Sequence, residues 1–235
     1  MGTNKRTVVA ALGSIALALT LSACGGGGDS GSTATPVTSF ALQAGYKARV
    51  AAGSSDNFSI SGTCGGTATT TTSSASPATF EGVAGYSAGQ TATLNLTGCT
   101  PATAAVTGTS YYDANYTPLG SSIPGVEYTK FITAPPALPT IIKVGDTALY
   151  ATLTVYADST KTTVTGQRQL SYVVEADSST TALITLIMRS YNNASQLLFT
   201  AQSKYRIAGD GTLNIVSMDV QYSTTSTTHL VYTKA

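Results

Sequence analysis

Few residues in this chain could carry out acid–base or nucleophilic chemistry. Its one histidine, His229, lies in the alternating stretch STTHLVYTKA, where it could act as the general base for a serine. No G-x-S-x-G motif presents such a serine on a strand-to-helix turn. We therefore expect His229 to be a packed or solvent-facing strand residue. The sequence predicts a protein that is not an enzyme, with a hydrolase as the less favoured alternative.

Carboxylate pairs offer a second kind of chemistry. Glu81 could pair with Glu127 as the acid and base of a glycosidase, and Glu175 and Asp177 offer another such pair. These pairs need a defined separation across a cleft, and the sequence gives no sign of one. The acidic residues at predicted turns also lack the Asp/Asn spacing of a calcium loop. We expect neither a bound metal nor a cofactor.

Two polar groups have both a functional and a simpler interpretation. Asp113, in the tyrosine-rich stretch SYYDANYTPLG, could help tyrosines to bind a sugar. We favour a turn that Asp113 or Asn115 caps, because these side chains hydrogen-bond to nearby backbone N–H groups. Lys204 and Arg206 share one strand face. We interpret them as a solubilising surface in preference to a rim for an anionic headgroup.

The N-terminus has the layout of an export signal. Lys5 and Arg6 precede an uncharged apolar run over residues 7–21, shorter than the ~20 residues of a membrane-spanning helix. Small residues then precede Cys24, as cleavage by a signal peptidase requires. The quartet Leu21–Cys24, LSAC, resembles the lipobox of bacterial lipoprotein signal peptides.

This resemblance implies that residues 1–23 are cleaved and that Cys24 carries a diacylglyceryl group and an N-terminal acyl chain. Two or three acyl chains form a stable membrane anchor, whereas one is marginal. Gly25 follows, where an aspartate would favour the inner membrane. The resemblance therefore implies the outer membrane, facing the periplasm, with exposure at the cell surface left open. Residues 24–37, rich in Gly, Ser and Thr, predict a flexible tether.

The two other cysteines form an even pair. With Cys24 assigned to lipid, Cys64 and Cys99 lie in an oxidising compartment, and we expect a disulfide between them. Closing a loop of this length contributes roughly 3–4 kcal/mol in the chain-entropy model. Two cysteines and one distant histidine fall short of a zinc ligand set.

The composition excludes a nucleic-acid partner and favours an exported β protein. Charged residues make up only 10% of the chain, and no cluster of Lys and Arg provides the positive surface that nucleic acid requires. The chain has 13 tyrosines and no tryptophan. Tyrosine suits sheet faces on which the ring is buried and the hydroxyl is hydrated.

Alternating apolar and polar residues predict strands after the signal. From Ile141 onward, short polar turns separate about seven or eight strands, which predicts an antiparallel meander that bends or closes into a barrel. Thr38–Ala51 is predicted as a strand, and no run of about ten residues has helical spacing. The Gly- and Thr-rich strands before the prolines of Thr133–Thr140 predict a small sandwich.

The expected organisation is an all-β chain. Residues 38–134 form an N-terminal, sandwich-like β domain that contains the disulfide, and residues 135–235 form the C-terminal meander. The prolines mark the boundary, because proline cannot join the interior of a sheet. Whether the two regions are separate domains or pack as one is left open.

Several stretches resemble a family of uncharacterised exported lipoproteins of Gram-negative bacteria: SGTCGGTATTTT, FEGVAGYSA, TSYYDANYTPLG, VGDTALYATLTVYADSTKTTVTG and LSYVVEADSSTTALITLI. This resemblance implies an envelope address and no particular activity. The leading hypothesis is a membrane-anchored, non-catalytic module that is structural or binds an apolar ligand on a concave sheet face. The alternative is a protein–protein or adhesive component of an envelope assembly.

Overall fold

The described part of the chain, residues 37–223 and 228–235 of this computed structural model, consists mainly of strands. One helix, α2 (Leu42–Ala52), follows the first short strand. The strands are β1 (Ser39–Phe40), β2 (Ser54–Gly62), β3 (Gly65–Thr72), β4 (Ser76–Phe80), β5 (Val83–Thr97), β6 (Thr103–Asp113), β7 (Pro118–Ile123), β8 (Glu127–Phe131), β9 (Ile142–Lys143), β10 (Thr147–Tyr156), β11 (Val164–Ala176), β12 (Thr181–Asn192), β13 (Leu197–Ala208), β14 (Leu213–Tyr222) and β15 (His229–Lys234). The prediction of an all-β chain is confirmed.

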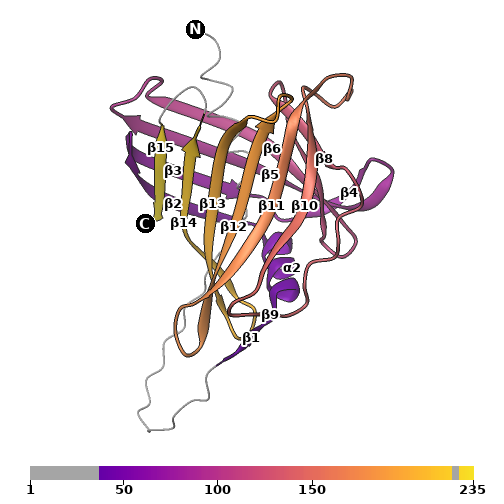
Figure 1. The fold of residues 1–235 in the computed structure, drawn as a ribbon, viewed down its shortest axis with the longest axis vertical. Helices are drawn as coiled ribbons and strands as arrows, with labels where there is room; N and C mark the ends of the chain where they lie inside the picture. The colour runs from indigo at the N-terminus through magenta and orange to yellow at the C-terminus, as the bar shows by residue number, and fades with distance from the viewer. Residues whose placement is uncertain (1–36, 224–227) are drawn as a thin grey trace.

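Twelve of the described strands pair antiparallel into a closed barrel (Figure 1). Their order around the barrel is β3-β2-β15-β14-β13-β12-β11-β10-β8-β7-β6-β5, and pairing of β3 with β5 closes the ring. β4 pairs with the first part of β5, and β1 pairs with β9 in a separate two-stranded sheet. Closure gives each barrel strand two neighbours, so that none of the twelve is an edge strand.

The C-terminal meander is confirmed, because consecutive strands from β10 to β15 are neighbours in the sheet. The sheet does not stop there. β10 also pairs with β8, where Leu153 lies opposite Phe131, and β15 pairs with β2. Residues 38–134 and 135–235 therefore build one barrel, in which each region covers the sheet edges of the other. The proline-rich segment Thr133–Thr140 lies outside the ladder between them.

Alternation along the strands separates the inside of the barrel from its outside. In Figure 1, β10 to β15 run upright in front, while β2, β3, β5 and β6 cross behind them in a transverse direction. On β13, the inward residues Phe199, Ala201, Ser203, Tyr205 and Ile207 are buried, and the side chains that alternate with them are more exposed, as the alternation predicts. The core lies between these two walls.

The predicted disulfide between Cys64 and Cys99 is present, with Cα atoms 5.7 Å apart. Cys64 directly precedes β3, and Cys99 lies two residues beyond the end of β5. Gly65 of β3 pairs with Thr97 of β5 at this end of the ladder. The covalent bond therefore fastens the strand pair that closes the barrel.

The prediction of a strand over Thr38–Ala51 is wrong, because most of this segment forms helix α2. Leu42, Tyr46, Arg49 and Val50 lie on one helix face, and all four are buried. An arginine in the middle of this face masks the apolar spacing on which a helix prediction depends. The surrounding Ala, Gln, Lys and Arg residues have good helix propensity.

Helix α2 packs through a close backbone contact. A Cβ atom added to Gly45 would overlap the carbonyl oxygen of Gly211, in the turn between β13 and β14. Only glycine allows this approach of helix to turn, because any side chain would push the two backbones apart. Gly45 therefore fixes where the helix lies against the barrel.

Replacing Gly45 by alanine should lower the midpoint of urea unfolding. Alanine would favour an isolated helix by about 1 kcal/mol over glycine, but overpacking against a rigid backbone costs typically 1–3 kcal/mol. Gly89→Ala is the matched control, because its new Cβ meets only the Ser73 hydroxyl oxygen, at 3.7 Å. A midpoint for Gly45→Ala at or above that of the wild type would contradict this packing.

Candidate functional site

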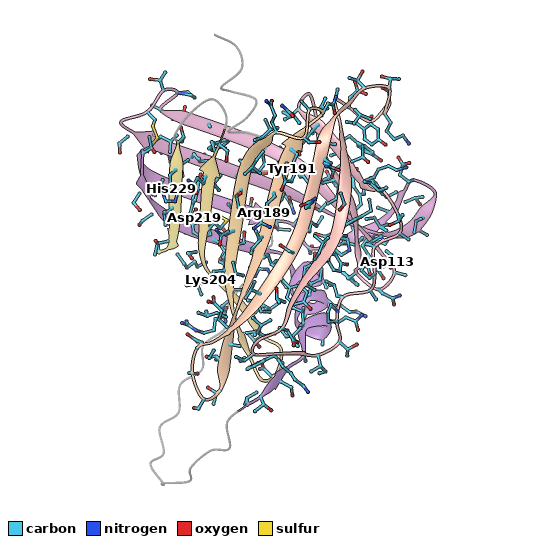
Figure 2. All side chains as sticks on the ribbon, viewed as in Figure 1. Asp113, Arg189, Tyr191, Lys204, Asp219 and His229 are labelled. Carbon is cyan, nitrogen blue, oxygen red and sulfur yellow. A yellow bond between two sulfur atoms is a disulfide. The ribbon has the colours of Figure 1, made fainter. Side chains whose placement is uncertain are left out.

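His229 lies on the outer surface with a carboxylate as its partner. Its Nε2 atom is 2.9 Å from Oδ2 of Asp219, and the two side chains are 45% and 41% exposed (Figure 2). Its backbone N–H donates to the hydroxyl of Thr63. No hydrogen bond joins His229 to a serine within the described residues, and His229 lines neither of the two main pockets there. The geometry gives this histidine no nucleophile.

Asp113 caps a turn, as the simpler interpretation predicts. Its Oδ1 atom accepts hydrogen bonds from the backbone N–H groups of Asn115 and Thr117, both at 2.8 Å. The nearby rings of Tyr86 and Tyr116 stack on each other with their centroids 4.5 Å apart. One face of each of these two rings is therefore used within the protein.

The two proposed carboxylate pairs do not form. Glu81 accepts hydrogen bonds from Lys161, Tyr128 and Lys130, and the first two contacts contribute most to lowering its pKa to about 2. Glu127 is instead buried inside the barrel. Each carboxylate is thus held by its own partners, on different sides of the barrel wall.

The second proposed pair, Glu175 and Asp177, does not form either, because each carboxylate contacts a different surface cation. Oε2 of Glu175 lies 3.6 Å from Nζ of Lys204, and Arg206 donates to Asp177 at 2.6 Å, which lowers the pKa of Asp177. These contacts fit the interpretation of Lys204 and Arg206 as a solubilising surface. No group of three or more His, Cys, Asp or Glu side chains could hold a metal ion within residues 37–223 and 228–235.

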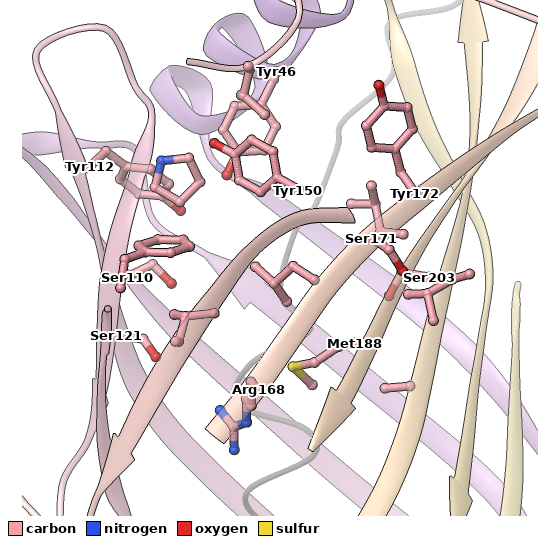
Figure 3. Close-up of a pocket in the computed structure, with 18 of the residues that line it drawn as sticks. Tyr46, Ser110, Tyr112, Ser121, Tyr150, Arg168, Ser171, Tyr172, Met188 and Ser203 are labelled. Carbon is pink, nitrogen blue, oxygen red and sulfur yellow. The ribbon is translucent and has the colours of Figure 1, made fainter. Parts of the chain in front are cut away.

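The strongest candidate site is a cavity of about 220 Å³ inside the barrel (Figure 3). Its walls are largely apolar and come from helix α2, from both walls of the barrel and from the proline-rich segment. The main apolar residues are Leu42, Phe131, Leu138, Leu153, Leu170, Ile184, Leu186, Met188, Ala201 and Leu213. Sequence reasoning anticipated an apolar concave face but identified none of these residues as a site.

Strand register explains why these side chains meet. Leu170 on β11 pairs with Met188 on β12, which pairs with Ala201 on β13. Directly paired residues in a sheet point to the same side, so this row faces the interior together. The same wall is extended by the next inward row, two residues further along β11, which consists of Tyr172, Leu186 and Ser203.

A buried ion pair lies at one end of the cavity. Nη1 and Nη2 of Arg168 donate to the two carboxylate oxygens of Glu127 at 2.7 and 2.5 Å, and the side chains are only 3% and 5% exposed. The guanidinium also lies 5.8 Å from the ring centroid of Phe199. The bidentate pair is electrically neutral, so this end adds no net charge to the cavity.

The opposite end of the cavity is rich in tyrosine. Tyr46, Tyr112 and Tyr150 gather there beside helix α2, far from Arg168 (Figure 3). Burial is the main cause that raises the pKa of all three phenols, to about 12 for Tyr112. They are therefore neutral O–H groups at physiological pH.

The proline-rich segment closes one side of the cavity. Leu138 and Pro139 contribute to its wall, and the hydroxyl of Tyr150 donates to the carbonyl oxygen of Pro136 at 2.7 Å. The segment expected as a boundary between domains is thus part of the site. Tyr150 reaches it from β10, where a bulge interrupts the pairing between Leu149 and Ala151.

One sequence signal could have identified this interior. In GQRQLSYVV, Arg168 alternates in phase with Leu170, Tyr172 and Val174. A charged residue in the inward phase of a strand must have a buried partner, because an unpaired buried charge is very costly. Sequence alone does not identify Glu127, 41 residues earlier, as that partner.

The predicted lipidation site and its surroundings lie outside the described residues. These include the signal over residues 1–23, Cys24 itself and the tether as far as residue 36. In the described ranges, no helix has both the length and the hydropathy needed to cross a membrane. Comparison with family models, curated proteins and solved structures gives no match for this chain.

Removing one partner of the Arg168–Glu127 pair should destabilise the barrel strongly. Arg168→Met or Glu127→Met leaves a buried charge unpaired, which costs about 3–5 kcal/mol, whereas the double variant should lose much less than the sum. Urea unfolding of the four proteins measures the coupling. Lys204→Met removes an exposed partner of Glu175 and should cost less than about 1 kcal/mol. Additive losses in the double variant would contradict the pairing.

Proposed function

We propose that this protein is a lipid-anchored, non-catalytic binding module of the bacterial envelope, and that its barrel holds a small molecule with an apolar body. The observation that carries this proposal is the largely apolar cavity that lies between helix α2 and the two walls of the barrel. Ligand pockets are commonly apolar cavities with a few polar groups that fix orientation.

The size of the cavity limits the ligand. Its volume of about 220 Å³ is below the range of roughly 300–1,000 Å³ typical of drug-sized ligands. An apolar cavity of about 150 Å³ suffices for benzene. The expected ligand is therefore somewhat larger than benzene and smaller than most drugs or a whole lipid.

The chemistry of the walls limits it further. Leu, Ile and Met side chains can offer dispersion contacts but no hydrogen bonds, so a polar group placed against them would lose its water without compensation. Charged and phenolic groups lie at the two ends of the cavity, where Arg168 is paired with Glu127 and Tyr46 and Tyr112 are neutral, and only a few small hydroxyls such as Ser171 and Ser203 lie between them (Figure 3). The body of the ligand must therefore be largely apolar.

We propose that the protein is attached to the membrane by a lipid anchor on Cys24. Support comes from the order of charge, apolar run and LSAC box at the N-terminus. A tether of a dozen Gly/Ser/Thr-rich residues has a root-mean-square span of roughly 20 Å. This span would let the barrel stand clear of the outer-membrane headgroups on the periplasmic side.

A protein-interaction role is the second candidate. The observation in its favour is a set of exposed large apolar side chains, among them Ile132 at 59% and Leu149 at 65%. Single exposed apolar residues are ordinary on protein surfaces, and only a contiguous patch indicates a partner. We therefore place ligand binding first.

Ala201→Leu should block binding by filling the cavity. Indole is a suitable neutral probe, because the chain contains no tryptophan and indole fluorescence can be followed against tyrosine alone. We expect wild-type protein to shift the indole emission to the blue and Ala201→Leu to weaken binding about tenfold or more, a loss of ~1.4 kcal/mol.

The matched control for this experiment is Gln202→Leu. It adds a similar side chain at the next position of β13, which is exposed on the outside of the barrel. It should bind indole like the wild type, and both variants should unfold cooperatively in urea. Equal affinity of Ala201→Leu and wild type, or no binding of indole by the wild type, would contradict the cavity as the binding site.

Cys24→Ala should release the protein from the membrane. Expressed with its signal in a Gram-negative host, the wild type should fractionate with the outer membrane and carry acyl mass on Cys24, whereas the variant should lose both. The double variant Cys64→Ala/Cys99→Ala is the control for loss of a thiol and should stay anchored. A wild-type protein without acyl mass would overturn the anchor.

A further inference from the structure

Arg49 is a buried cation whose hydrogen-bonding capacity is unused. It lies on helix α2 with its side chain 1% exposed, and its nearest carboxylate oxygen, Oδ2 of Asp56, is 3.5 Å away. Its Nε, Nη1 and Nη2 atoms make no hydrogen bond within the described residues. Buried polar groups almost always have partners, so such an arginine calls for an explanation.

The charge around Arg49 is incompletely balanced. Asp56 is shared, because its other oxygen, Oδ1, contacts Nζ of Lys234. Two cations therefore meet one carboxylate. Burial lowers the pKa of Arg49 to about 9 in spite of the opposing attraction of Asp56. Arg49 therefore shares its nearest carboxylate with a partly exposed lysine.

Arg49 lies behind the tyrosine-rich end of the cavity. On helix α2 it follows Leu42 and Tyr46 at spacings of seven and three residues, which place all three on one face, and the other two line the cavity. Its guanidinium carbon is 5.8 Å from the ring centroid of Tyr205, another lining residue. Arg49 also interacts electrostatically with Tyr46 and Tyr112.

We infer that the ligand is a small monocarboxylate whose apolar body fills the cavity and whose carboxylate accepts a hydrogen bond from Tyr112, which itself accepts from Tyr46 and Ser110, in the positive field of Arg49. This inference rests on the proposed binding function and names the chemical class of the ligand. The ligand carboxylate would also act as a counter-ion for Arg49, whose nearest protein carboxylate, Asp56, is shared with Lys234.

The physical case is a balance between desolvation and pairing. A carboxylate that leaves water for an apolar site is strongly disfavoured unless hydrogen bonds and an opposite charge replace the water. The Tyr112 O–H, polarised by the hydrogen bond it accepts from Tyr46, and a nearby guanidinium provide both, and hydrogen bonds to an ionised acceptor are roughly twice as strong as neutral ones. A neutral ligand of the same shape would leave Arg49 uncompensated.

Benzoate and benzamide test this inference, because they share a shape and differ in the charge of one end. In isothermal titration calorimetry at neutral pH, wild-type protein should bind benzoate at least about tenfold more tightly than benzamide. Arg49→Met should lose this preference while it retains its affinity for benzamide. Lys47→Met is the matched control, because it removes one positive charge from the exposed side of the same helix.

The outcomes separate the two proposals. If indole binds but wild-type protein shows no preference for benzoate, the monocarboxylate inference fails and the binding function stands. If neither indole nor benzoate binds, both fail. If Arg49→Met does not fold, Tyr112→Phe removes the donating hydroxyl in its place and should reduce the preference for benzoate. An undiminished preference in a folded Arg49→Met protein would overturn the role of Arg49.

Discussion

The pairing of β3 with β5 is the contact on which the rest of the structure depends. It joins the two ends of a sheet that would otherwise leave a strand edge exposed, and the Cys64–Cys99 bond fastens one end of it. Once the sheet is closed, inward-facing side chains of distant strands share one interior. The core, the buried ion pair and the cavity all follow from this closure.

Closure also explains why the interior contains charges. Arg168 is 3% exposed in the inward phase of a closed barrel, so its charge needs a partner, and its guanidinium donates two hydrogen bonds to Glu127 on the neighbouring part of the wall. Arg49 meets the same constraint from helix α2 with only a shared carboxylate. The contrast between Arg168, which makes a bidentate ion pair, and Arg49, which makes no hydrogen bond within the described residues and lies behind the other end of the cavity, supports binding of an amphipathic ligand.

Much of this fold is predictable from local pattern. Alternation assigned the inward residues of β13, the turn at Asp113 followed from Asx chemistry, and pairing of Cys64 with Cys99 followed from the assignment of Cys24 to lipid. The rest depends on contacts between distant residues. No local signal aligns Gly65 with Thr97, and an arginine on the buried face masked helix α2. The cavity exists only where these non-local pieces meet.

Methionine methyl groups give the most direct test of the central claim, that the barrel interior is the binding site. Met188 lines the cavity, whereas Met218 is buried in the core and does not line it. In methyl NMR spectra of protein labelled at methionine, added indole should shift the Met188 signal through the ring current and leave Met218 nearly unchanged. An unmoved Met188 signal at saturating indole, or equal shifts of both signals, would contradict the account.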